Sequence, residues 1–132
     1  MSGGDAGPST PGDRVVDVCA SLPGAQLTFP FGPRTAVYKV ADKMFALVAT
    51  DGDGQRVNLK CDPDYASYLV QQYDGIVPGY HMNKRHWITV TLADTVPWDV
   101  VEELIHVSYD LVVSSLSAKV RGALTDRPRD GR

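Results

Sequence analysis

The chain has 132 residues and a formal net charge of −3, and 43% of its residues are hydrophobic and 22% charged. This length suits one domain, and the composition excludes a fibrous or wholly disordered chain. Two cysteines are too few for a disulfide framework, and no apolar run approaches the ~18 residues of a membrane span. The start shows no basic segment followed by an apolar one, so we expect a cytoplasmic protein that does not enter a membrane.

Both ends of the chain are rich in Gly, Ser, Pro and small polar residues. Such segments bury too little apolar surface to become ordered. We therefore predict a disordered tail over residues 1–10, one domain over residues 11–122 and a second disordered tail over residues 123–132.

The first predicted element is a short helix. Thr10 is a suitable N-cap, Pro11 suits the first helical position, and Asp13 completes a partial capping box. Pro23-Gly24 then ends the helix.

Four strand-like runs follow. Residues 26–31 alternate loosely and contain a proline, which indicates an edge strand. Residues 36–40 and 44–50 read as a hairpin, and a turn at 51–54 leads into a strand over residues 55–61.

The second half of the chain adds two helices and a strand. Asp62 and Pro63 begin a helix that Asp74-Gly75 closes, and residues 76–86 show no regular pattern. Residues 87–92 alternate as a strand, and a helix of about twenty residues starts near Pro97. The order helix–strands–helix–strand(s)–helix predicts an α+β fold, with an antiparallel sheet packed on one face by helices.

No motif indicates an enzyme. The sequence lacks the GxSxG, Walker, GxGxxG and HExxH patterns. A nucleophile pair of Cys61 and His81 can be drawn, but nothing in the sequence places the two together. His81 and His86 lack a Cys pair or a nearby carboxylate to complete a metal site. We expect no catalytic activity, no metal and no cofactor.

Charge is distributed unevenly along the chain. Residues 18–41 and 75–93 contain no Asp or Glu but hold Arg34, Lys39, Lys84 and Arg85, whereas residues 94–118 hold five carboxylates and no Lys or Arg. The pattern predicts an acidic helix and at least one basic region.

The basic region also contains aromatic residues. Tyr80 and Trp87 bracket Asn83, Lys84, Arg85 and His86. Cations neutralise phosphates, an Asn amide bonds base edges and aromatic rings stack on bases. The alternative is structural: both rings fill the edge of the core, and the Lys-Arg pair is a solvated loop.

Neighbouring strands could widen this region. In residues 55–61, Val57 and Leu59 point to one face, and Arg56, Asn58 and Lys60 to the other. The candidate nucleic-acid-binding residues are therefore Lys39, Lys60, Tyr80, His81, Asn83, Lys84, Arg85, His86 and Trp87. Trp98 is either a surface anchor for a partner or a local staple.

Several segments resemble the MmcQ/YjbR family. They are Phe29-Pro30-Phe31-Gly32-Pro33, Leu59-Lys60-Cys61-Asp62-Pro63, Ser108-Tyr109-Asp110-Leu111-Val112 and the distinctive run from Pro78 to Trp87. The resemblance covers about residues 13–116. It implies a compact α+β fold similar to frataxin-like and secretion-chaperone-like domains, and a DNA-binding label that rests on fold analogy.

The leading hypothesis is a small non-enzymatic module that binds DNA weakly and in a salt-dependent manner through residues 80–87 and nearby strand faces. The alternative is a protein-interaction adaptor or homodimeric chaperone-like module with no role in nucleic-acid binding. The sequence allows either a monomer or a homodimer.

Overall fold

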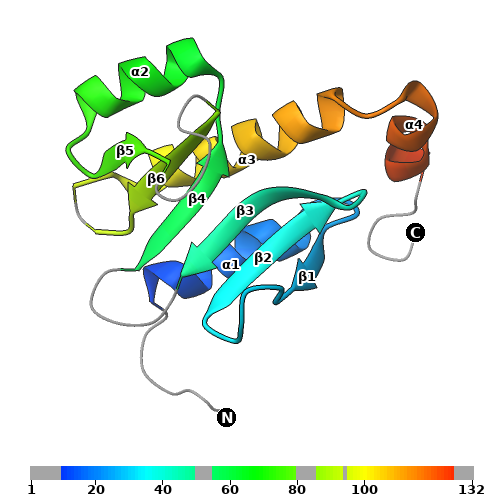
Figure 1. Ribbon diagram of the computed structural model, residues 1–132, viewed down its shortest axis with the longest axis horizontal. Helices are drawn as coiled ribbons and strands as arrows, with labels where there is room; N and C mark the ends of the chain where they lie inside the picture. The colour runs from blue at the N-terminus through cyan, green and yellow to red at the C-terminus, as the bar shows by residue number, and fades with distance from the viewer. Residues whose placement is uncertain (1–9, 50–54, 80–85, 94, 127–132) are drawn as a thin grey trace.

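Figure 1 shows the computed structural model, which describes residues 10–49, 55–79, 86–93 and 95–126. These residues form four helices and six strands. In chain order the elements are α1 (Pro11–Ser21), β1 (Gln26–Thr28), β2 (Thr35–Val40), β3 (Lys43–Ala49), β4 (Arg56–Lys60), α2 (Pro63–Gln72), β5 (Ile76–Pro78), β6 (Trp87–Thr91), α3 (Trp98–Ser114) and α4 (Ala118–Asp126).

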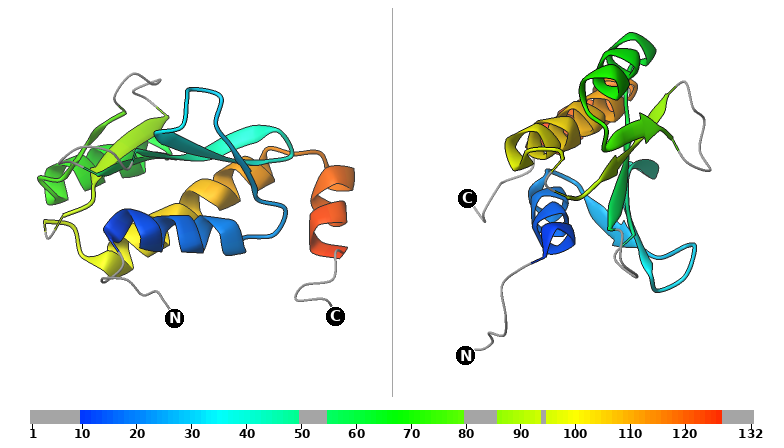
Figure 2. Two further views of the ribbon diagram at one scale, coloured as in Figure 1. Left: turned by 90° about the horizontal axis from the view of Figure 1, so that it is seen from below. Right: turned by 90° about the vertical axis from the view of Figure 1, so that its left-hand side faces the viewer.

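The strands form one sheet in the order β1-β2-β3-β4-β6-β5, and every neighbouring pair is antiparallel. Helices α1 and α3 lie side by side against one face of this sheet (Figure 2). Helix α2 packs beside β5 at one edge, and α4 lies near the opposite end (Figure 1). The predicted α+β fold is confirmed. No described helix is long and apolar enough to cross a bilayer.

The start of α1 follows the predicted capping box. The Asp13 backbone N–H donates to Thr10 Oγ1 over 3.1 Å, and the Thr10 N–H donates to the Asp13 carboxylate over 3.1 Å. The start of α2 differs in one respect from the expectation. Asp62 precedes Pro63 as predicted, but the Asp62 side chain makes no capping hydrogen bond.

The β2–β3 hairpin turns through Ala41 and Asp42, whose φ angles are 49° and 67°. Two consecutive positive φ angles are the geometry that a two-residue hairpin turn requires. The register then shifts from Tyr38↔Ala46 to Lys39↔Met44, which leaves Phe45 as an extra residue in β3. Because of this bulge Phe45 faces the helices, where its ring meets that of Tyr109 edge-on at 5.4 Å between centroids.

A buried hydroxyl on α3 forms hydrogen bonds with two backbone groups beside this bulge. Ser108 is fully buried; its hydroxyl donates to the Phe45 carbonyl over 2.5 Å and accepts from the Lys60 N–H over 2.8 Å. The β3–β4 ladder has its last pair at Ala46↔Leu59, so these two backbone groups lie just beyond it. Ser108 therefore fastens α3 to both strands where their own pairing stops.

Three elements differ from the sequence-based expectation. β1 ends at Thr28 instead of continuing to residue 31, and β5 lies inside the segment predicted to be irregular. A further helix, α4, follows α3 and runs to Asp126, so the expected domain boundary at Gly122 falls inside it. The tails at 1–9 and 127–132 are outside the described residues.

Helix α4 is attached to the domain through Leu124, which is 8% exposed and belongs to the main core cluster. Its Cδ2 atom lies 2.4 Å from where a Cβ at Gly24 would be, and Gly24 has a φ of +77°. Only glycine suits this position, because a side chain would be strained and would collide with Leu124.

Candidate nucleic-acid interface

The face of the sheet opposite α1 and α3 presents the second set of alternating strand residues. Val57 and Leu59 of β4 belong to the core beneath the helices, so Arg56, Asn58 and Lys60 point to the opposite side. We call this surface the open sheet face. It comprises Lys39, Met44, Arg56, Asn58, Lys60, Trp87, Thr89 and Thr91.

Three cations lie on the open sheet face. Lys39 is on β2, level with Met44, while Arg56 and Lys60 stand at the two ends of β4. Arg56 is exposed and the two lysines are partly exposed. Strand spacing separates the Cα positions of Lys39 and β4 by about 10 Å, and four residues along β4 span about 13 Å. A single phosphate backbone can meet groups at these separations.

Positive and negative side chains lie in different layers of the molecule, the first on the strands and the second on α3. The described strands contain Lys39, Lys43, Arg56 and Lys60 but no Asp or Glu, whereas α3 alone carries four carboxylates. Lys43 turns toward the helices, where its Nζ donates to Ser115 Oγ over 3.3 Å. The remaining three strand cations give the open sheet face its positive character.

Trp87 lies in a small buried cluster on the open sheet face. It is 8% exposed and packs with Val37, Leu47 and Met44. Gly79 lies against it, since a Cβ there would come within 2.7 Å of Trp87 Cβ. The two expectations for Trp87 are stacking on a base and filling the edge of the core, and its burial favours the second.

The structure brings together part of the predicted site. Lys39, Lys60 and Trp87 share the open sheet face, and His86 is exposed next to Trp87, with its carbonyl accepting from the Cys61 N–H over 2.8 Å. The other predicted residues, Tyr80, His81, Asn83, Lys84 and Arg85, lie outside the described part of the chain.

Sequence reasoning did not identify two features of the molecule as parts of a site. Asn58 and Thr89 lie opposite one another on β4 and β6, and the Thr89 hydroxyl donates to Asn58 Oδ1. This polar pair depends on strand register, which alternation along one strand does not reveal.

The second feature is an apolar segment that begins in β1 and continues past its end. Leu27, Phe29 and Phe31 are 50%, 50% and 64% exposed. The signal was present in the sequence, because three large apolar residues alternate within residues 27–31 of an expected edge strand. Contiguous exposed apolar side chains mark interaction surfaces more often than isolated ones do.

The two thiols are poorly suited to nucleophilic chemistry. Burial raises the pKa of Cys19 to about 12 and, with a smaller contribution from the Asp62 carboxylate, that of Cys61 to about 11. A catalytic cysteine needs the opposite shift. Among the described residues no three His, Cys, Asp or Glu side chains are grouped as metal ligands would be.

Comparison with known proteins identifies the chain. The YjbR family model matches residues 20–111, which is most of the domain. The chain belongs to the YjbR family.

Similar proteins occur in several bacteria. YjbR of Escherichia coli K12 is 32% identical over 111 residues, or 84% of this chain and 94% of its own length. YbdF of Escherichia coli O157:H7 is 39% identical over 98 residues, or 74% of this chain and 80% of its own length.

The crystal structure of Deinococcus radiodurans protein DR2400, which carries a DUF419 domain, has a TM-score of 0.81 to this YjbR-family chain at 39% identity. The match covers 93% of this chain and 94% of the other. The fold of the family is therefore shared along nearly the whole chain.

Proposed function

We propose that this YjbR-family protein is a small non-enzymatic DNA-binding module that holds the phosphate backbone against the open sheet face. Lys39, Arg56 and Lys60 contact phosphates, Trp87 supports the surface from within, and His86 lies at its margin. Lys84 and Arg85 extend the contact from the neighbouring segment, together with Tyr80, His81 and Asn83.

One observation carries the proposal. Three of the four cations in the described strands, Lys39, Arg56 and Lys60, lie on the side that the helices leave open, and these strands contain no carboxylate to neutralise them. A molecule with net charge −3 is repelled by DNA as a whole. Its cations can attract DNA only where several of them lie on one surface, and the open sheet face carries three of them.

Binding through phosphates predicts a specific dependence on salt. For duplex DNA, log Kobs falls with log salt concentration at a slope of about −0.9 per phosphate contact. The three cations on the open sheet face give a slope of about −2.7, and Lys84 with Arg85 makes it about −4.5. Fluorescence polarisation with a labelled duplex, repeated from low to physiological salt, measures this slope.

Single substitutions test which of the cations contact phosphates. Lys60→Gln and Arg56→Gln each reduce the size of the slope by about 0.9. Lys119→Gln is the matched control, because it removes one charge from α4 and leaves the slope unchanged. The double variant Lys84→Ala, Arg85→Ala tests the adjoining segment separately. A wild-type slope in both β4 variants would refute the open sheet face as the contact surface.

The exposed apolar segment favours a second function, that of a protein-interaction adaptor. Leu27, Phe29 and Phe31 could bury their side chains against a protein partner or a second copy. Trp98 is less suited to this role, because it is partly buried beneath Arg14. Sedimentation velocity separates the two functions: a dimer that ignores duplex DNA supports the adaptor and contradicts the DNA-binding module.

A further inference from the structure

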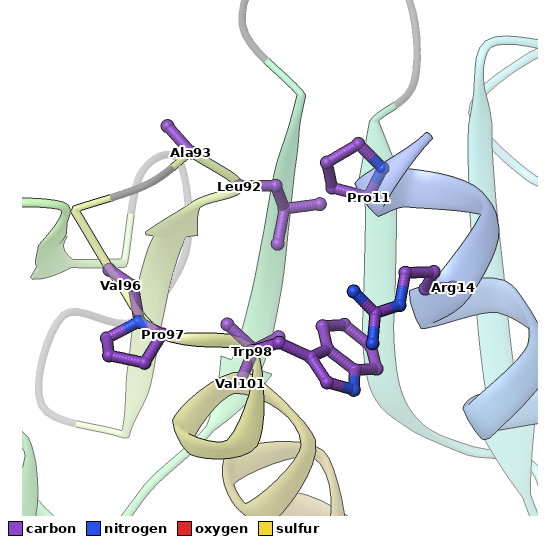
Figure 3. Close-up of a pocket in the computed structure, with 8 residues that line it drawn as sticks. All are labelled: Pro11, Arg14, Leu92, Ala93, Val96, Pro97, Trp98 and Val101. Carbon is purple, nitrogen blue, oxygen red and sulfur yellow. The ribbon is translucent and has the colours of Figure 1, made fainter. Parts of the chain in front are cut away.

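A pocket of about 190 Å³ lies on the helix side of the sheet, between the start of α1, the end of β6 and the start of α3 (Figure 3). Arg14 is the one charged residue among those that line it, and the others have apolar or aromatic side chains. Leu92, Val96 and Val101 are its buried members, and Pro11, Ala93, Pro97 and Trp98 complete it. A cavity of about 150 Å³ is large enough to admit benzene, so this pocket has room for a small organic molecule.

One cation lies in the wall of this pocket. The Arg14 guanidinium stacks over the Trp98 ring, with its central carbon 4.1 Å from the ring centroid (Figure 3). Stacking uses the flat face of the guanidinium and leaves its N–H groups free to donate in the plane. A carboxylate in that plane can accept two parallel hydrogen bonds.

The charge of Arg14 is not neutralised within the described chain. The carboxylate of Asp13 accepts from the Thr10 N–H, in the cap of α1. Asp17, one turn further along α1, and Asp99, next to Trp98, form no ion pair with Arg14. Apolar walls with a single unneutralised guanidinium at the side are complementary to a small anion with an apolar body.

We propose that this pocket binds small monocarboxylates that have an aromatic or branched aliphatic body. The body packs against Leu92, Val96 and Val101, and the carboxylate pairs with Arg14 above the Trp98 ring. This site is on the opposite side of the sheet from the proposed DNA contact, so neither proposal depends on the other.

The test uses 3-phenylpropanoate as probe and its uncharged amide, 3-phenylpropanamide, as matched control. Two-dimensional ¹H–¹⁵N NMR of the full chain follows the backbone amides around the pocket. We expect saturable shifts centred on Leu92, Trp98 and Val101, with a Kd of about 0.1–1 mM for a ligand of this size. The amide should bind about tenfold more weakly, because it cannot form the charged pair.

Variants of Arg14 complete the test. Arg14→Gln should weaken binding of the acid about tenfold and remove its advantage over the amide, and Arg14→Lys should give an intermediate loss. Both variants should leave the salt dependence of DNA binding unchanged. Equal binding of acid and amide to the wild type, no shifts at about 10 mM acid, or shifts confined to the open sheet face would each overturn the proposal.

Discussion

Burial keeps the Cys19 and Cys61 thiols protonated well above neutral pH. A thiol whose pKa is raised by folding favours the native state as long as it stays protonated. The ordinary pKa of each is 9.0, and folding raises it to about 12 in Cys19 and about 11 in Cys61. The stabilisation is therefore complete below pH 9 and declines as the pH rises from 9 toward these folded-state values.

We predict that the free energy of unfolding falls above pH 9 by up to about 1.4 kcal/mol per pH unit for each thiol. Urea denaturation at pH 8, 9 and 10 measures the decline. Burial also raises the pKa of Tyr38 and Tyr65, so the informative quantity is the difference from the double variant Cys19→Ala, Cys61→Ala. An equally steep decline in that variant would contradict the assignment to the thiols.

Among the elements, the junction of β3, β4 and α3 depends most on one side chain. Ser108 serves the Phe45 carbonyl and the Lys60 N–H together. Replacing it with alanine leaves both backbone groups without their partner, and an unsatisfied buried polar group costs about 1–3 kcal/mol. Because Lys60 is one of the proposed DNA contacts, we expect the same change to loosen the edge of the open sheet face.

We predict that Ser108→Ala lowers the free energy of unfolding by about 2 kcal/mol. Ser114→Ala is the control, since the Ser114 hydroxyl is exposed and donates only to Leu111 within its own helix. That change should cost less than about 0.5 kcal/mol. Urea denaturation compares the two variants, and similar losses would show that the Ser108 bridge is not important for stability.

Elements with a strong local signal could be predicted from the sequence. The capping residues of α1 and the period-2 pattern of β4 gave both elements within about a residue. β5 could not be found this way, because it has three residues, includes Pro78 and forms only by pairing with β6. α4 has little amphipathic pattern, and its position depends on tertiary contacts, among them the packing of Leu124 against Gly24 and the core.

The candidate site was predictable to the same degree. Alternation in β4 places Lys60 away from the core, so its orientation followed from the sequence. The burial of Trp87 did not, because the sequence left base stacking and filling the edge of the core both open. The cluster that buries it joins Val37, Leu47 and Trp87 from three different strands, and only the register of the sheet brings them together.

At the scale of the whole molecule, positive and negative charges lie on different surfaces. The described strands are free of carboxylates, and α3 presents Asp99, Glu102, Glu103 and Asp110 on its exposed positions. A net charge of −3 and an isoelectric point near 5.5 conceal this separation. Local fields of this kind act over about a Debye length, so they govern contacts at low salt.

We predict that the protein binds both heparin and an anion exchanger at pH 7 and low salt. The open sheet face binds heparin and the surface of α3 binds the exchanger. Arg56→Glu with Lys60→Glu should abolish retention on heparin and increase the salt needed for elution from the exchanger. Unchanged elution from heparin would show that the positive charge is located elsewhere.

The two borders of the sheet are unequal. On β5 the residues facing away from β6 are Ile76, whose N–H donates to Tyr73, and Pro78, which has no N–H. Over Ile76–Pro78 that border offers an incoming strand no backbone donor, whereas β1 forms the other border beside exposed Phe29 and Phe31. Any growth of the sheet by strand addition must therefore use β1. Two molecules joined through their β1 strands would leave only their β5 borders open, and these lack the donors, so assembly would stop at a closed pair and would not continue into a fibre.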